Sequence, residues 1–376
     1  MRYRNILIAP DSFKGGVSSV RFCEIVSEEI KQQRPEAAVM SLPLADGGEG
    51  TLECLKISAG GKCVNVDTVG PYGEPMKAEI LFTKVNEAVI ETASCAGLPL
   101  VSGRMDPEKT TTAGLGKLIA YAVSHGAEHI ILTLGGSCTN DCGAGMLSEL
   151  GIVFRDEDGN RFVPTGGTLS RVRSIEKSAG FARYEDITFT AMCDVRNPLY
   201  GENGCTHIFA RQKGADNAMI GRLEAGVCSF AAIVVEFSGR DLSQDEGCGA
   251  AGGLGFACRA FLGGELKSGI ETVLDLCGFD RLVSSADLVI TGEGRFDRQS
   301  LMGKVVGGIA ARSGSIPVAV LCGKCSDTDI PAFPNLKYII PVSEGQKLDY
   351  AIAHEPENLR HGTDRLLSML EGKSVT

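Results

Sequence analysis

Five turns, most of them rich in glycine, carry the side chains in this sequence that are best suited to chemistry. Each follows a short apolar run, and they are DSFKGG from Asp11, LADGGEGT from Leu44, GGSCTND from Gly135, CDVRNP from Cys193 and TGEGRFDRQ from Thr291. Together they would supply carboxylates and backbone N–H groups, with cations from Lys14, Lys213, Arg295 and Lys304. Phosphoryl transfer needs this mixture: oxygen ligands for Mg²⁺, N–H donors for phosphates, a cation for developing charge and a carboxylate for the hydroxyl. The residues therefore favour phosphotransfer over other chemistry.

Motifs for other chemistries are incomplete. Residues 247–252 match GxGxxG, but the charged stretch 241–246 before them is not the strand that a dinucleotide site requires. Small residues for close helix packing explain this stretch better. No Gly-Lys pair has the glycine five residues earlier that a P-loop requires. Cys322 and Cys325 form a CxxC without the second pair that a zinc site needs.

Length, charge and cysteine content limit the class of protein. A chain of 376 residues is long for one core, so we expect two domains. A net charge of −10 argues against a nucleic-acid partner. The fourteen cysteines are scattered singly, which indicates reduced thiols rather than a disulfide framework. With no recognisable signal peptide and no apolar run of about 18 residues, we expect a cytoplasmic protein without a membrane partner.

Alternating strand and helix patterns must position the turns. The sequence predicts strands at 5–10, 37–42, 129–134, 287–290, 316–321 and 337–341. It also predicts a helix capped by Ser18 or Ser19 that ends at Arg34, and a helix that begins near Val305. Repeated strand–turn–helix units indicate a doubly wound parallel sheet, whose ligands bind at the carboxyl ends of strands beside helix N-termini. We therefore expect the turns at Asp11, Asp46, Gly135 and Gly292 on one sheet edge.

Other parts of the sequence have more strand character. Residues 77–82 and 187–195 alternate between apolar and polar positions, and 152–163 read as a hairpin around Asp158-Gly159. Residues 247–276 read as a Gly/Ala-rich helix. We expect a discontinuous flavodoxin- or Rossmann-like α/β domain and a second, β-rich α/β domain inserted into it. The first would comprise residues 1–61, 106–151 and 272–376, and the second residues 62–105 and 152–271.

In this order, the turns resemble those of the bacterial-type glycerate kinase family. The matching stretches are APDSFKG (9–15), PLADGGEGT (43–51), LGGSCTNDCGAGML (134–147), CDVRNPLYG (193–201), ARQKGA (210–215), GCGAAGGLG (247–255) and DLVITGEGRFDRQSLMGK (287–304). The resemblance implies ATP-dependent, Mg²⁺-assisted phosphorylation of D-glycerate, most often to 2-phosphoglycerate, in a cleft between a flavodoxin-like and a second α/β domain. It also implies a place in glyoxylate or glucarate breakdown. Cys138 and Cys142 depart from the pattern, since they stand where Ala or Gly is expected.

Roles for individual residues are expectations that leave alternatives open. The catalytic set is Lys14, Asp194, Arg295 and Asp297. Lys14 or Arg295 would hold an anion, and Asp194 would serve as Mg²⁺ ligand or general base, with Asp46, Glu49, Glu293 and Asp297 competing for those roles. The residues expected to bind substrate or nucleotide are Asp11, Ser12, Asp46, Gly47, Gly48, Glu49, Gly135, Gly136, Ser137, Thr139, Asn140, Asp141, Gln212, Lys213, Gly292 and Glu293. Helix N-capping is an equally good interpretation of Asp46 and Asp141.

Two other functions remain open on the sequence alone. One is a non-catalytic sensor of small hydroxy acids, and the other is an NAD-linked oxidoreductase. The retained acids speak against the sensor, because binding glycerate alone needs cations more than carboxylates.

Overall fold

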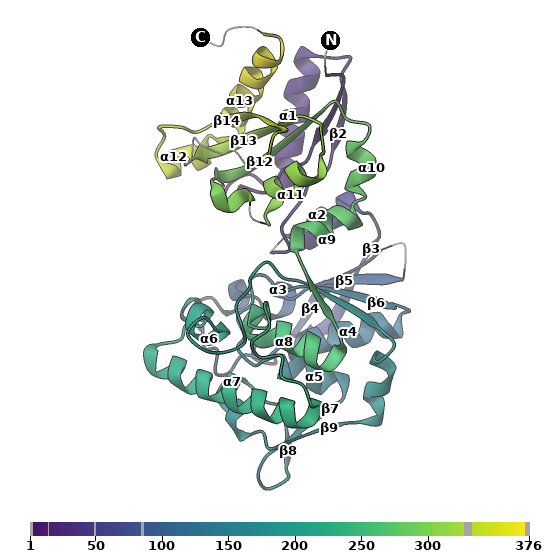
Figure 1. Ribbon diagram of the computed structural model, residues 1–376, viewed down its shortest axis with the longest axis vertical. Helices are drawn as coiled ribbons and strands as arrows, with labels where there is room; N and C mark the ends of the chain where they lie inside the picture. Colours follow the sequence, from purple (N-terminus) through teal and green to yellow (C-terminus); the bar gives the residue numbers. More distant parts are fainter. Residues whose placement is uncertain are drawn as a thin grey trace. The chain divides into compact units, whose positions relative to one another are not determined.

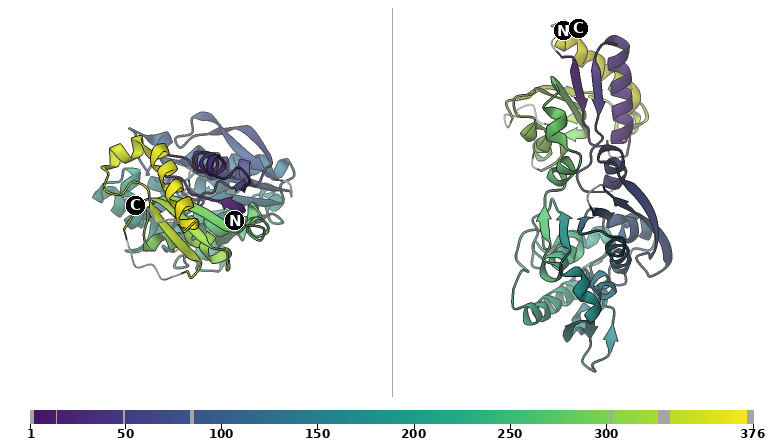
Figure 2. Two further views of the ribbon diagram at one scale, coloured as in Figure 1. Left: turned by 90° about the horizontal axis from the view of Figure 1, so that it is seen from above. Right: turned by 90° about the vertical axis from the view of Figure 1, so that its right-hand side faces the viewer.

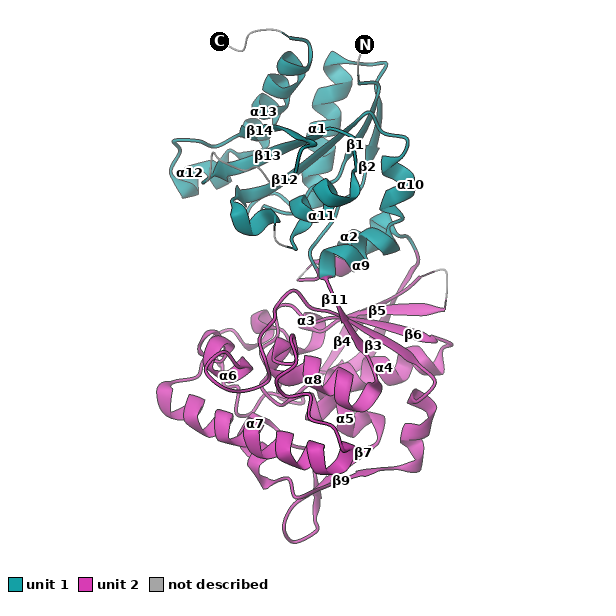
Figure 3. Cartoon of the chain, in the orientation of Figure 1, with its two compact units in different colours: residues 1–46, 53–60, 269–376 teal, residues 47–52, 61–268 magenta. Residues whose placement is uncertain are grey.

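The computed structural model describes residues 3–13, 15–48, 50–83, 86–301, 303–326 and 333–372. The chain divides into two compact units, each of mixed α/β structure (Figure 3). Unit 1 comprises residues 1–46, 53–60 and 269–376, and unit 2 comprises residues 47–52 and 61–268.

Unit 1 is built on a five-stranded sheet in which every strand pair is parallel. Its strands, in spatial order, are β14 (Leu336–Pro341), β13 (Val318–Cys325), β12 (Leu288–Phe296), β1 (Asn5–Ile8) and β2 (Ala38–Ser41) (Figure 1). Numbered by their order within this sheet, the strands follow the flavodoxin order 2-1-3-4-5. The strand order reverses between β1 and β12, where Ile6 lies opposite Leu288. The expected discontinuous, flavodoxin-like parallel sheet is confirmed.

Helices cover this sheet. α1 (Ser19–Gln33) and α13 (Glu355–Leu370) pack side by side and bury Phe22 and Leu359 against Ile290 and Leu321 of the strands (Figures 1 and 2). The hydroxyl of Ser18 accepts the N–H of Arg21, which confirms the predicted cap of α1. The remaining helices with residues in unit 1 are α2 (Thr51–Ser58), α9 (Gly269–Leu276), α10 (Phe279–Val283), η5 (Arg298–Leu301), α11 (Val305–Arg312) and α12 (Leu348–Ala353). The predicted start at Val305 is thus confirmed.

β12 is longer than the sequence indicates. We expected a strand at 287–290 followed by a Gly292-Glu293-Gly294 turn, but pairing with β13 continues through Glu293 opposite Cys322 and Arg295 opposite Lys324. Gly292 serves packing rather than a turn, since a Cβ there would lie 2.4 Å from the Leu321 carbonyl oxygen and 2.6 Å from the Phe22 ring. Glu293 and Arg295 therefore extend from a strand, which restrains their backbone more than a loop would.

Unit 2 contains a six-stranded sheet and a smaller three-stranded one. The first has the order β11 (Glu265–Lys267), β10 (Thr188–Met192), β6 (His129–Thr133), β5 (Glu87–Glu91), β4 (Pro75–Phe82) and β3 (Lys62–Val69). Neighbouring strands from β11 to β10, β6 and β5 pair in parallel, whereas β4 pairs antiparallel with both β5 and β3. The second sheet consists of β8 (Arg161–Phe162), β7 (Ile152–Arg155) and β9 (Ser174–Lys177), and it includes the predicted hairpin with Gly159 at φ 78°.

Two expectations about this region are wrong. β6 pairs with β5 and β10, so the Gly135 turn that follows it belongs to the unit 2 sheet and not to the sheet that contains β1. Residues 106–151 accordingly fall in unit 2, whereas we expected them in the first domain. The second error is the single helix at 247–276. It consists of α8 (Ala250–Leu262) and α9 separated by β11, and residues 251–253 have left-handed φ values of 52–91°.

Helices of unit 2 pack around its sheet. They are α3 (Ala93–Ala96), η1 (Leu98–Val101), α4 (Ala113–Ser124), α5 (Ala144–Leu150), η2 (Gly166–Arg171), η3 (Ala179–Tyr184), α6 (Cys205–Phe209), η4 (Arg211–Lys213), α7 (Asn217–Ser238) and α8. Within the described part of the chain, α7 is the one helix whose length and composition would allow it to cross a membrane. Its residues Val227, Phe230 and Val234 belong to the core of unit 2 together with Phe154. Packing inside the unit therefore accounts for the apolar character of α7.

Candidate active site

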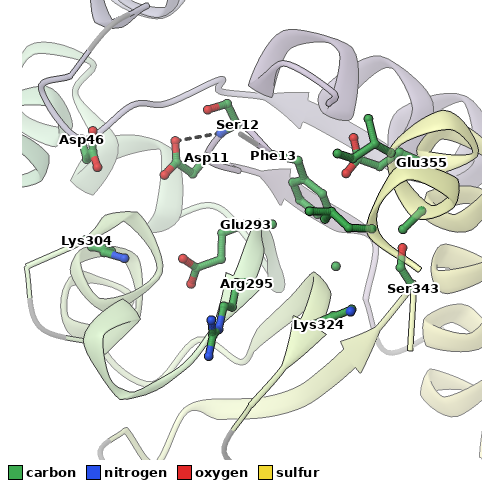
Figure 4. A pocket seen from close by; sticks show the side chains of 15 residues that line it. Asp11, Ser12, Phe13, Asp46, Glu293, Arg295, Lys304, Lys324, Ser343 and Glu355 are labelled. Atoms are coloured by element: carbon green, nitrogen blue, oxygen red, sulfur yellow. Dashed lines mark hydrogen bonds between the residues drawn. The ribbon is translucent and has the colours of Figure 1, made fainter. Parts of the chain in front are cut away.

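A cavity of about 470 Å³ lies at the carboxyl edge of the unit 1 sheet (Figure 4). Its walls come from the ends of β1, β12, β13 and β14, from the segment after β2, from the residue before α11, and from α12 and α13. The lining residues are Asp11, Ser12, Phe13, Asp46, Glu293, Gly294, Arg295, Lys304, Gly323, Lys324, Ser343, Leu348, Ala351, Ile352 and Glu355. Its volume is typical of small-molecule sites, and its place at the reversal of strand order is where open α/β sheets bind ligands.

The backbone after β1 brings the first acidic turn beside β12. The N–H of Ala9 donates to the Ile290 carbonyl at 2.8 Å, and the N–H of Asp11 donates to the Gly292 carbonyl at 2.9 Å. The Asp11 carboxylate accepts the N–H of Ser12 at 2.7 Å. Two segments from opposite ends of the chain thus place carboxylates in one cavity.

Glu293 has the most unusual environment in this cavity. Its exposed fraction is 6%, and its Oε1 atom has no hydrogen-bond partner among the described residues. The pKa of Glu293 is raised to about 7, mainly by burial and in smaller part by the charges of Asp11 and Asp297, while Ser300 and Lys304 act in the opposite direction. A carboxyl group in this state can exchange a proton near neutral pH.

Cations surround this acid. Arg295 has a side chain that is 71% exposed, and its Nε atom lies 3.0 Å from Ser326 Oγ and 3.6 Å from Asp297 Oδ2. Lys304 and Lys324 also line the cavity. These groups could bind phosphate or carboxylate oxygens while Glu293 handles a proton.

Asp297 mainly organises the loop after β12. Its Oδ1 atom accepts the N–H groups of Gln299 at 2.9 Å and Ser300 at 3.3 Å. The residue lines a separate, open hollow of about 530 Å³ with Arg295, Arg298, Gln299 and Ser326. It is therefore placed to position Arg295 and Ser300.

One wall of the cavity is apolar. It consists of Phe13, Leu348, Ala351 and Ile352. Phe13 is 2% exposed and lies 5.7 Å from the Phe22 ring, centroid to centroid, so core packing fixes it. Glu355 closes this end, because its Oε2 atom accepts the N–H of Val17 at 2.5 Å. Burial raises the pKa of Glu355 as well.

A second polar cluster occupies the carboxyl edge of the unit 2 sheet. The turn after β6 contains Gly136 at φ 74°, a conformation that glycine adopts without strain. Lys213, which is 2% exposed, donates from Nζ to Ser137 Oγ at 3.1 Å and to the Thr139 carbonyl at 2.7 Å. Burial lowers the pKa of Lys213. The lysine from η4 therefore holds the Ser137–Thr139 turn in place.

The next two residues of this turn have structural contacts. Asn140 donates from Nδ2 to Thr206 Oγ1 at 3.3 Å. Asp141, fully buried, accepts the N–H and hydroxyl of Thr112, both at 2.8 Å, and the N–H groups of Gly143 at 3.1 Å and Gly145 at 3.2 Å. These contacts join the starts of α4 and α5, which is the helix-end role named above as the alternative for Asp141.

The remaining expected site residues lie apart from these contacts or outside the described chain. Asp194 is exposed just beyond β10, and Gln212 is exposed in η4. Gly47 and Gly48 belong to unit 2, and Gly135 packs so closely that a Cβ there would lie 2.7 Å from the Gly48 Cα. Lys14 and Glu49 lie outside the described residues.

The structure thus sorts the expected residues into two groups. Asp11, Ser12, Asp46, Glu293 and Arg295 share the unit 1 cavity, and Ser137, Thr139 and Lys213 share the unit 2 cluster.

Several cavity residues were not among those expected to act. They are Phe13, Lys324, Ser343, Leu348, Ala351, Ile352 and Glu355. For Lys324 and Ser343 a signal existed, since they follow the predicted strands 316–321 and 337–341 just as Asp11 follows its own. The six-residue helix α12 is too short for a periodic apolar pattern to reveal it.

Comparison with known proteins decides the family. The model of the Glycerate kinase family matches residues 6–371 of this chain. The chain belongs to the glycerate kinase family. Two relatives are a glycerate kinase of Bacillus cereus, 42% identical with 85% of each chain covered, and a glycerate 2-kinase of Escherichia coli, 40% identical with 86% of each chain covered. A crystal structure of a candidate glycerate kinase 2 from Salmonella typhimurium LT2 has a TM-score of 0.86 and 36% identity, covering 98% of this chain and 99% of its own.

Membership of the glycerate kinase family confirms the resemblance read from the turns. It also confirms that the chain is an enzyme with a mixed α/β fold, since its relatives and its structural neighbour are described as kinases of this type.

The acids of the described residues would suit a magnesium ion held by one carboxylate rather than one enclosed by several protein ligands. Within the described ranges, no group of three or more His, Cys, Asp or Glu side chains could hold a metal ion. Mg²⁺ retains waters and is usually held in kinases by one or two carboxylates together with phosphates, so one well-placed acid suffices. Asp46 in the cavity and Asp194 beyond β10 both offer such an acid.

Proposed function

We propose that this enzyme transfers a phosphoryl group from ATP to D-glycerate, with Mg²⁺, and that 2-phosphoglycerate is the product. Membership of the glycerate kinase family supports the reaction, and the relative described as a glycerate 2-kinase supports the position of transfer. The observation that carries the location is Glu293, a buried carboxyl in a cavity lined by Arg295 and Lys304, whose Oε1 atom has no hydrogen-bond partner among the described residues.

In this proposal Glu293 acts as the general base. A carboxylate whose pKa lies near 7 accepts a proton from the attacking hydroxyl efficiently at neutral pH. Its burial excludes water, which strengthens every charge interaction in the cavity. Arg295 and Lys304 hold the anionic groups and stabilise charge that develops during transfer.

Magnesium supplies charge neutralisation when it binds with the nucleotide. Asp46 or Asp194 would hold it, and Asp194 also remains a candidate for the base. Asp297 acts in this scheme by positioning Arg295, and Lys14 remains a proposed anion ligand.

The other proposed contacts to substrate or nucleotide follow the matched turns. In unit 1 they come from Asp11, Ser12 and the strand residue Gly292. In unit 2 they come from Gly47 to Glu49, from the 135–141 turn, and from Gln212 and Lys213. The hydrogen bonds of Lys213 support a positioning role for this lysine in the turn.

A coupled assay tests the reaction. The enzyme is incubated with ATP, Mg²⁺ and D-glycerate together with enolase, pyruvate kinase and lactate dehydrogenase, and pyruvate formation is followed without phosphoglycerate mutase. Signal without the mutase supports 2-phosphoglycerate, and signal only with it indicates the 3-phospho isomer. No signal in either case contradicts the kinase and favours a binding protein.

We also propose a cytoplasmic location and a role in glyoxylate or glucarate breakdown. The structure pairs none of the fourteen cysteines in a disulfide, which suits a reducing compartment. The net charge of −10 remains an argument against nucleic-acid binding.

A further inference from the structure

We infer that ATP lies along the carboxyl edge of the unit 1 sheet, with its adenine against α12 and its phosphates directed toward Glu293. This inference rests on the proposed function and extends it, because it assigns the unit 1 cavity to one of the two reactants and gives that reactant a direction.

The length of the cavity is the first argument. Its lining includes residues from the ends of β1, β12, β13 and β14, which are consecutive neighbours in the sheet, and Asp46 from the segment after β2. Three inter-strand steps of about 4.8 Å each make an edge of about 14 Å. D-glycerate has only three carbons and would occupy a fraction of this edge, whereas a nucleotide with its phosphates would follow most of it.

The distribution of side chains along the edge is the second argument. Figure 4 shows Asp46 and Lys304 at one end, Glu293 and Arg295 in the middle, and Lys324 nearer the other end. The apolar residues Phe13, Leu348, Ala351 and Ile352 gather on the side of α12. An apolar wall suits the faces of a purine ring, and D-glycerate has no comparable apolar surface.

The same distribution fixes the direction. In the reverse orientation the base would displace water from carboxylates and ammonium groups without replacing their hydrogen bonds, which is unfavourable. The phosphates would then face apolar side chains and the buried carboxyl of Glu355. In the inferred orientation the phosphates meet Lys324, Arg295 and Lys304, and the transferred group arrives beside Glu293.

Leu348 provides an independent sign of a missing apolar partner. Its side chain lines the cavity although it is 65% exposed to solvent. A base bound against α12 would cover it. Tyr350, two residues along, is also exposed, at 54%, but does not line the cavity. Tyr350 is therefore a suitable control for Leu348, because both are exposed on the same short helix and only Leu348 lines the cavity.

The test compares Leu348→Asp with Tyr350→Asp, which add the same charge to the same helix. We expect Leu348→Asp to weaken ATP binding about tenfold, measured by titration calorimetry and as KM for ATP, while KM for D-glycerate changes less than about twofold. Tyr350→Asp should leave both constants near those of the wild type. Circular dichroism checks that both variants are folded.

Other outcomes would overturn the inference. A rise in KM for D-glycerate with unchanged ATP binding would assign the cavity to the acceptor instead. Equal effects of the two variants would show that charge, and not the apolar wall, is responsible. Calorimetry measures ATP binding without turnover. A wild type that binds ATP but transfers no phosphoryl group would contradict the proposed function, and the orientation of ATP would then be tested by the binding constants of the two variants. A wild type that does not bind ATP would overturn both.

Discussion

The backbone N–H of Asp11 donates to the carbonyl of Gly292 at 2.9 Å, so the chain after β1 continues the parallel pairing with β12 beyond the end of β1. This contact places the Asp11 carboxyl beside Glu293 at the point where the strand order reverses. The charge of Asp11 adds to the effect of burial in raising the pKa of Glu293. A parallel-sheet contact is therefore part of what prepares Glu293 for proton transfer.

Glu293→Gln should abolish most of the activity. If Glu293 is the general base, its loss lowers kcat by about 10²–10⁴-fold. In the wild type, kcat/KM should rise with pH through about pH 7, because the ionised form is the base, and the variant should lose this dependence. Glu357→Gln, at an exposed position of α13, serves as the control. A kcat near the wild-type value in Glu293→Gln would exclude it as the base.

The same substitution should change stability with pH. The pKa of Glu293 is raised on folding from 4.5 to about 7, so the native state binds its proton more tightly than the unfolded state does. The wild type therefore loses stability as pH rises from 4.5 through 7, by up to about 3 kcal/mol from this group. Glu293→Gln lacks this titration. We therefore expect the free energy of unfolding of the variant, minus that of the wild type, to be larger at pH 8 than at pH 5. Urea unfolding at the two pH values measures this, and an equal difference at both would contradict the burial effect.

Lys213→Ala should destabilise unit 2. The substitution leaves the Thr139 carbonyl and Ser137 hydroxyl without their ammonium partner and opens a cavity in a buried site. We expect a loss of about 2–4 kcal/mol in the free energy of unfolding. The exposed neighbour Gln212, changed to alanine, should cost less than about 0.5 kcal/mol. Equal unfolding midpoints for the two variants would show that the buried lysine contributes nothing to the turn.

Much of the fold followed from the sequence because strand and helix periodicities are local. The start of α1, the start of α11 and the hairpin at Gly159 were read correctly for this reason. The sheet to which β6 belongs was not, since the partners of a parallel strand lie far away in the chain.

The candidate site divides in a similar way. The acids at strand ends were visible as polar residues after apolar runs. The apolar wall could not be predicted in this way. In the sequence Leu348 and Ile352 are indistinguishable from core residues, and only the fold places them beside a cavity.

Arg312→Ala should weaken the packing of α11 on α9 and α10. The guanidinium contacts both carboxylate oxygens of Asp280, at 2.9 and 2.6 Å, and Asp275 Oδ1 at 2.7 Å, while its own side chain is only 18% exposed. Because the acidic partners are exposed and screened by solvent, we expect a loss of about 1–2 kcal/mol. Arg21→Ala, which removes one exposed pair with Glu24, should leave the melting temperature close to that of the wild type. Indistinguishable melting curves for the two variants would contradict this role.

Gly292→Ala should destabilise the enzyme and displace the proposed base at the same time. The added methyl would lie 2.4 Å from the Leu321 carbonyl oxygen and 2.6 Å from the Phe22 ring, so β12 and β13 must move apart or the core must shift, at a cost of about 1–3 kcal/mol. Glu293 is the next residue of the strand, and kcat should fall with the stability. Gly221→Ala on an exposed turn of α7, where a Cβ meets nothing within 4 Å, is the control of opposite sign and should stabilise by about 0.5–1 kcal/mol. If Gly292→Ala kept wild-type stability and kcat, Gly292 would not be the close-packing residue that fixes Glu293.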